Sequence, residues 1–183
     1  SLNGHKVVAI ADNAFDQCAS IVSVEIPDTV ISIGQYAFSY CESLESVNIP
    51  DSMEEIGGNA FIMRRSMRGE MTLPKGLKKL GEGAIDGCAI TKLIVKATDF
   101  RSNSPFNVGY NGYSFGCPDL RDIEIPSCAK PLEYRFPNSY EKITNIVVTS
   151  TEEAVGDSAF RGCKSLKTIS LPETIKAYES QSF

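Results

Sequence analysis

The chain has 183 residues, of which 42% are hydrophobic and 22% charged, and it carries a formal net charge of −5. This composition is typical of a globular protein and excludes both a disordered chain and a membrane helix, which needs about 20 consecutive apolar residues. The negative charge argues against nucleic acid as a partner, because neutralising phosphates requires a basic surface.

Residues 33–50 contain the unit from which most of the chain is built. The unit reads Ile33-Gly-Gln-Tyr-Ala-Phe-Ser-Tyr-Cys-Glu-Ser-Leu-Glu-Ser-Val-Asn-Ile-Pro50. Its first half, with an Ala-Phe pair and a cysteine, suits a short helical or irregular turn. In its second half Val47 and Ile49 alternate as in a half-buried strand. We therefore expect each unit to form one coil of a solenoid, with Phe38 and Ile33 closing the core opposite the strand.

This unit recurs along the whole chain at an interval of about 23 residues. The residues that end the predicted strands are Ile26, Ile49, Leu73, Val95, Ile125, Val148 and Leu171. Such a period lies in the range of leucine-rich repeats, in which every unit adds one strand to a parallel sheet. It predicts a right-handed solenoid of seven coils, mostly β or repeat α/β, with one parallel sheet and irregular or helical returns. A partial eighth coil follows over 178–183.

The repeats cover residues 1–183, so we expect a single domain. Neither end carries a recognisable cap, which predicts a fragment of a longer protein. Gly34, Gly57, Gly81 and Gly156 follow the same apolar residue in their coils, which suggests a backbone conformation that a side chain would strain. The coils differ most at residues 98–113, which form an insertion. Phe115 follows the strand end Val95 by 20 positions, whereas this interval is 11 or 12 positions in the other coils.

Our first choice for a partner-binding surface is this insertion together with the sixth coil, whose sequence departs from the repeat motif. Six of the 16 aromatic residues of the chain lie there, and they are Phe100, Phe106, Tyr110, Tyr113, Tyr134 and Tyr140. Aromatic side chains dominate interface energies, and insertions in repeat proteins form loops. The alternative stays open that some of these rings fill the core in coils whose sequence departs from the repeat motif.

The exposed side of the predicted sheet, which we expect to be concave, is the second choice. Period two turns outward the residues one and three before each strand end. In the central coils these residues are Lys92, Ile94, Asp122, Glu124, Asn145 and Val147. The corresponding residues of the other coils are small, polar or acidic, which suits a soluble sheet as well as a binding surface.

The sequence offers little catalytic chemistry. His5 is the only histidine, so the common nucleophilic designs lack a well-placed base. The glycines of 81–87 do not match a dinucleotide fingerprint, and no Cys-x-x-Cys occurs. We therefore expect no enzyme activity, no cofactor and no metal site. Four of the six cysteines sit at one repeat position as small hydrophobic groups, which leaves Cys117 and Cys128 as the better candidates for exposure or pairing.

The motif Ile-Gly-x-x-Ala-Phe-x-x-Cys-x-x-Leu-x-x-Val-x-Ile-Pro resembles the BspA-like leucine-rich repeats of bacterial and protist surface proteins. The resemblance covers nearly all of the chain and is strongest at residues 10–50 and 155–172. It implies a protein-binding or adhesion module at the cell surface or in a secreted protein, with host extracellular-matrix or surface proteins as partners. The alternatives are a structural spacer for another domain and, more weakly, a carbohydrate-binding or glycosidase-like surface. The chain itself contains no signal peptide pattern.

Overall fold

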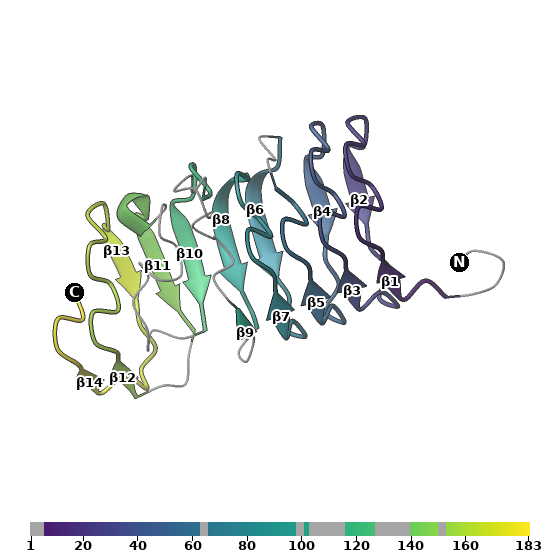
Figure 1. Ribbon diagram of the computed structural model, residues 1–183. Helices are drawn as coiled ribbons and strands as arrows, with labels where there is room; N and C mark the ends of the chain where they lie inside the picture. Colours follow the sequence, from purple (N-terminus) through teal and green to yellow (C-terminus); the bar gives the residue numbers. More distant parts are fainter. Residues whose placement is uncertain (1–5, 63–65, 98–100, 103–115, 127–139, 150–152) are drawn as a thin grey trace.

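The computed structural model describes residues 6–62, 66–97, 101–102, 116–126, 140–149 and 153–183. Parallel strands, one from each coil, form one face of a solenoid (Figure 1). They are β2 (Ser23–Glu25), β4 (Ser46–Asn48), β6 (Arg68–Leu73), β8 (Ala89–Val95), β10 (Asp122–Ile125), β11 (Asn145–Val148) and β13 (Thr168–Ser170). The last five pair in the order β13-β11-β10-β8-β6, and β2 pairs with β4.

Alternation of side chains along these strands decides which residues enter the core. Ile123 is buried, while Asp122 and Glu124 on either side of it remain partly exposed. Its neighbours in register, Leu93 of β8 and Ile146 of β11, are buried as well. A shift of one residue would turn this whole column outward, so the period-two pattern in the sequence fixes the register.

A second row of parallel strands runs along the opposite side of each coil (Figure 1). These strands have two residues each and are β1 (Ala9–Ile10), β3 (Ser32–Ile33), β5 (Glu55–Ile56), β7 (Lys79–Leu80), β9 (Arg101–Ser102), β12 (Ala154–Val155) and β14 (Ala177–Tyr178). The prediction of a single sheet was therefore incomplete. The return side also forms cross-coil ladders wherever its apolar residue, such as Ile33 or Ile56, is buried.

The turn that carries the Ala-Phe pair is not helical, and the only helix in the described part is the short 3-10 helix η1 (Tyr140–Lys142). Instead, its backbone bonds to the next coil. The N–H of Phe15 donates to Ala37 O at 2.8 Å, and the N–H of Phe38 donates to Ala60 O at 2.9 Å. Just before β4 the direction is reversed, since Glu45 N donates back to Val22 O at 2.8 Å. Backbone groups on both sides of a coil are thus bonded to neighbouring coils.

The regular spacing of the glycines along the chain has a different cause from the one expected. Gly34, Gly57 and Gly81 do not adopt positive φ values. A Cβ at Gly57 would lie 2.5 Å from Gln35 N, and one at Gly81 would lie 2.2 Å from Gly58 N. Glycine is needed here because the backbones of adjacent coils come into contact, leaving no space for a side chain.

A stack of phenylalanine rings fills the core behind these turns. The rings of Phe15 and Phe38 stack at 5.1 Å between centroids, and those of Phe38 and Phe61 at 5.5 Å with an interplanar angle of 2°. Phe38 and Phe61 are completely buried, whereas Phe15 in the first coil is 38% exposed. Phe38 and Phe61 are therefore covered by the coils on both sides of them, and no coil can bury its own ring alone.

The prediction of seven coils is slightly too high. The chain makes about six turns, because the seven strands from β2 to β13 enclose six complete intervals. The sequence pattern counted strands, whereas a turn of the solenoid needs the return that connects one strand to the next.

Replacing Phe38 by alanine removes a ring that two neighbouring rings cover. We expect the free energy of unfolding to fall by about 3–5 kcal/mol, measured by urea denaturation, because a cavity opens between three coils. Phe15→Ala is the matched control and should cost less, since that ring is stacked on one side only. A loss below about 1 kcal/mol for Phe38→Ala would show that the stack is not core.

Two adjacent glycines allow the contact between coil backbones to be tested. In Gly57→Ala the new methyl group would meet backbone atoms at 2.5 and 2.6 Å, while in Gly58→Ala the nearest atom is Glu82 O at 3.2 Å. We expect Gly57→Ala to lower the free energy of unfolding by at least about 2 kcal/mol and Gly58→Ala to cost clearly less. Equal effects of the two substitutions in thermal or urea denaturation would contradict close approach as the reason for glycine.

Candidate functional site

The aromatic residues predicted to bind a partner fall almost entirely outside the described residues. These are Phe100, Phe106, Tyr110, Tyr113 and Tyr134. Tyr140 begins the helix η1, but its side chain also lies outside the described part. Their grouping into one surface stays a prediction.

The second candidate surface is the outward side of β8, β10 and β11, which we call the sheet face. Strand register places Lys92, Asp122 and Asn145 in one row across the coils. Ile94, Glu124 and Val147 form the row beside it. All six side chains are partly exposed. The six residues singled out from sequence spacing are therefore contiguous, in two rows of three.

Electrostatics on this face are centred on Lys92. Its ammonium group bonds to the Glu70 carboxylate of the preceding coil at 2.7 Å. This hydrogen bond raises the pKa of Lys92; desolvation opposes it, and the charges of Glu70, Glu124 and Asp122 raise the pKa further. Lys92 therefore stays protonated at neutral pH and partly neutralises three acids. The resulting face is polar and mildly acidic, with an apolar residue on each side of Glu124.

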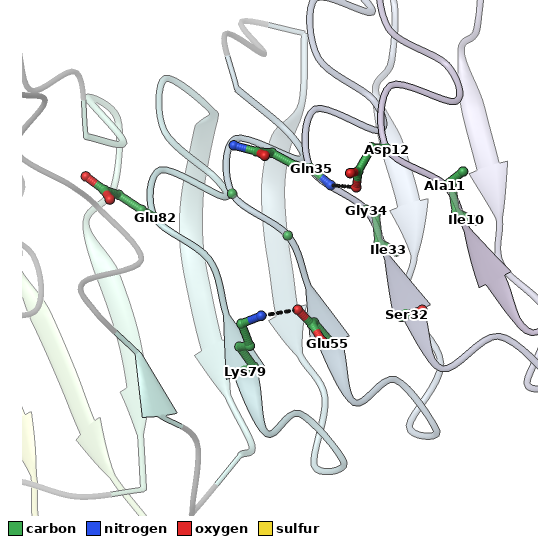
Figure 2. Close-up of a pocket in the computed structure, with 12 residues that line it drawn as sticks. Ile10, Ala11, Asp12, Ser32, Ile33, Gly34, Gln35, Glu55, Lys79 and Glu82 are labelled. Atoms are coloured by element: carbon green, nitrogen blue, oxygen red, sulfur yellow. Dashed lines mark hydrogen bonds and ion pairs between the residues drawn. The ribbon is translucent and has the colours of Figure 1, made fainter.

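A polar groove on the return side was not predicted from the sequence. It has a volume of about 570 Å³ and runs across the first four coils, past the ends of β1, β3, β5 and β7. Figure 2 shows the residues that line it, with Asp12, Gln35 and Glu82 along one side and the ion pair between Glu55 and Lys79 along the other. Gly34, Gly57 and Gly58 are among the residues that line it.

Several polar groups of this groove already serve to hold the coils together. The Asp12 carboxylate accepts a hydrogen bond from Gln35 N at 2.7 Å. A related contact near the other end of the chain runs the opposite way, since Glu179 of the following coil accepts from Asp157 N at 3.0 Å. At this position the direction of the backbone hydrogen bonds between coils changes. One backbone N–H therefore has no carbonyl partner, and a carboxylate accepts its hydrogen bond instead. Asp12 is thereby assigned to the fold rather than to a ligand.

The cysteines form a structural column. Cys41 Sγ donates to Phe15 O at 3.0 Å, and Cys88 Sγ donates to Phe61 O at 3.3 Å. Cys117 was predicted to lie off this column and to be a candidate for exposure, which is wrong. It is fully buried, and it donates to Ile85 O at 3.3 Å in the same way. Cys128 lies outside the described residues.

Neither a metal centre nor a membrane helix is found in the described ranges. Three or more potential His, Cys, Asp or Glu ligands do not converge anywhere in them. No helix there is long and apolar enough to cross a bilayer.

Thiol modification distinguishes the buried cysteine column from the exposed Cys18. Burial raises the pKa of the Cys117 thiol, so little reactive thiolate is present at pH 8. We expect iodoacetamide to modify Cys18 rapidly and Cys41, Cys88 and Cys117 only after urea is added, as read by peptide mass spectrometry. Modification of Cys117 as fast as Cys18 in the native protein would contradict its placement in the core.

Comparison with known proteins agrees with this geometry. The family profile described as BspA type Leucine rich repeat region matches residues 3–107, 69–138 and 132–183, with six copies. No curated protein matches the chain in sequence.

Two solved structures show the same fold. A T. pallidum leucine-rich repeat protein has a TM-score of 0.60 and 24% identity, over 97% of this chain and 70% of that one. A leucine-rich repeat protein from Eubacterium ventriosum has a TM-score of 0.54 and 18% identity, over 96% of this chain and 48% of that one. Because the family profile matches most of the sequence, the chain belongs to the BspA type leucine-rich repeat family.

Proposed function

We propose that the chain is a non-enzymatic protein-binding or adhesion module of a bacterial cell-surface or secreted protein. Membership of a repeat family whose members generally bind other proteins is the observation that carries this proposal. Neither the family nor the solved relatives indicate an enzymatic activity. Repeat solenoids suit this role because stacking gives them a long, rigid surface for their size.

The binding surface that we propose is the insertion at 98–113 together with the sixth coil. The concentration of aromatic residues supports this choice, since tyrosine and phenylalanine give large contact areas at little cost in conformational entropy. The sheet face remains the second choice. Lys92 partly neutralises its acidic residues, and ion pairs that are exposed contribute little to binding.

Replacing Tyr110 and Tyr113 together by alanine should weaken binding to a protein partner at least about tenfold, because tyrosines at interfaces often act as hot spots. The melting temperature should stay nearly the same. Binding can be measured by surface plasmon resonance against purified extracellular-matrix proteins. The matched control is Asp122→Ala with Glu124→Ala, which alters the sheet face and leaves the insertion intact.

The two variants separate the possible outcomes. Loss of binding in the sheet-face variant alone would move the site to β8, β10 and β11. If the unmodified chain binds no matrix or surface protein, the protein-binding proposal is rejected in favour of a structural spacer.

A further inference from the structure

Two positions in each return turn adopt a left-handed backbone conformation. The first directly precedes the alanine of the Ala-Phe pair, and its φ values are 56° at Asn13, 54° at Tyr36, 54° at Asn59, 64° at Gly83, 54° at Ser158 and 52° at Gln181. The second directly precedes the cysteine, with 58° at Gln17, 50° at Tyr40, 75° at Gly87, 45° at Gly116 and 75° at Gly162. We call these rows of equivalent positions the first and second left-handed columns.

Tyr36 and Tyr40 are unusual occupants of these columns. Glycine adopts positive φ without a steric penalty, and asparagine does so more easily than other residues. A bulky residue with positive φ is an outlier. The second coil is the only described one that carries a bulky aromatic residue in both columns, so its return turn contains two strained residues instead of two tolerant ones.

Hydrogen bonds between coils hold the backbone here, as where Tyr36 N donates to Gly58 O at 3.0 Å, but the contacts of the two side chains do not offset the strain. Tyr36 is 37% exposed and Tyr40 is 47% exposed, while Phe38 between them is buried. In the described part of the chain neither tyrosine hydroxyl has a hydrogen-bond partner, and neither ring stacks on another. Backbone strain that packing does not repay is concentrated at functional sites in proteins.

The surroundings of the two rings indicate the chemistry of a ligand. Asn13 and Asn59 occupy the first column on either side of Tyr36, and Gln17 precedes Tyr40 in the second. Coils in register are about 4.8 Å apart, so side chains at equivalent positions leave the backbone side by side. Each carboxamide offers both donors and an acceptor. None of the described residues in the two columns is charged.

We propose that Tyr36 and Tyr40 bind an uncharged carbohydrate on the outer surface of the second coil. The apolar face of a sugar ring would lie on a tyrosine ring, and the sugar hydroxyls would exchange hydrogen bonds with the neighbouring carboxamides. A protein partner would also use exposed tyrosines. The carboxamides favour a sugar, because they can donate and accept at once, and the Asp16 carboxylate, which accepts from Gln17 Nε2 at 3.4 Å, adds an acceptor for sugar hydroxyls.

The test replaces each tyrosine by a residue that the same column holds elsewhere. Tyr36→Asn follows Asn13 and Asn59, and Tyr40→Gly follows Gly87. The double variant should lose binding to uncharged oligosaccharides on a glycan array, with affinity in solution reduced at least about tenfold. Its melting temperature should be unchanged or higher by about 2–4 °C, because strain is relieved. Tyr178→Asn, at an exposed tyrosine of β14, is the control and should leave sugar binding intact.

Three results would overturn the proposal. A clear fall in melting temperature of the double variant would show that the rings stabilise the fold. If the unmodified chain binds no uncharged glycan, or binds charged glycans alone, uncharged carbohydrate is excluded as the ligand. Loss of protein binding in the double variant, with no sugar bound by the unmodified chain, would assign the tyrosines to a protein interface. Failure of the proposed protein-binding function leaves these outcomes unaffected, because the glycan array contains no protein partner.

Discussion

Direct backbone contact between neighbouring coils is the constraint on which the rest of this structure depends. At the end of a short return strand a coil donates a hydrogen bond to the coil before it, as Gly34 does to Ile10. In the return turns it donates to the coil after it, as Phe38 does to Ala60. The direction must reverse between the two, and this happens beside the glycine that lets the backbones touch. A methyl group at Gly81 would come within 2.2 Å of the adjacent coil.

The other repeated residues follow from this arrangement. Coils that are held about 4.8 Å apart bring equivalent side chains into columns. Rings stack in the phenylalanine column, thiols bond to carbonyls in the cysteine column, and exposed ion pairs such as Lys78 with Glu54 and Lys176 with Glu153 connect one coil to the next on the surface. Such ion pairs contribute little individually. They show that the same spacing governs the surface as well as the core.

The amino-acid sequence predicted those features that depend on side-chain pattern. Val47 and Ile49 revealed the strand, and the alternation around Ile123 revealed which residues share the sheet face. Features that depend on backbone geometry were missed or misread. The glycines were attributed to an unusual φ, whereas the unusual φ values belong to Tyr36, Tyr40 and their counterparts. Cys117 was misplaced because spacing was counted from Phe115, although the core position is set by the bond to Ile85 O.

Hydrogen exchange at the return turns tests most directly whether coils are held together by ladders on both sides. If the account is right, the amides of Phe38 and Phe61, which donate to Ala60 O and Ala84 O, are protected as strongly as those of Ile123 and Ile146 in the strands. Rapid exchange of the Phe38 and Phe61 amides, with protection confined to the strands, would contradict the account. Only the hydrogen bonds of the strands would then hold neighbouring coils together.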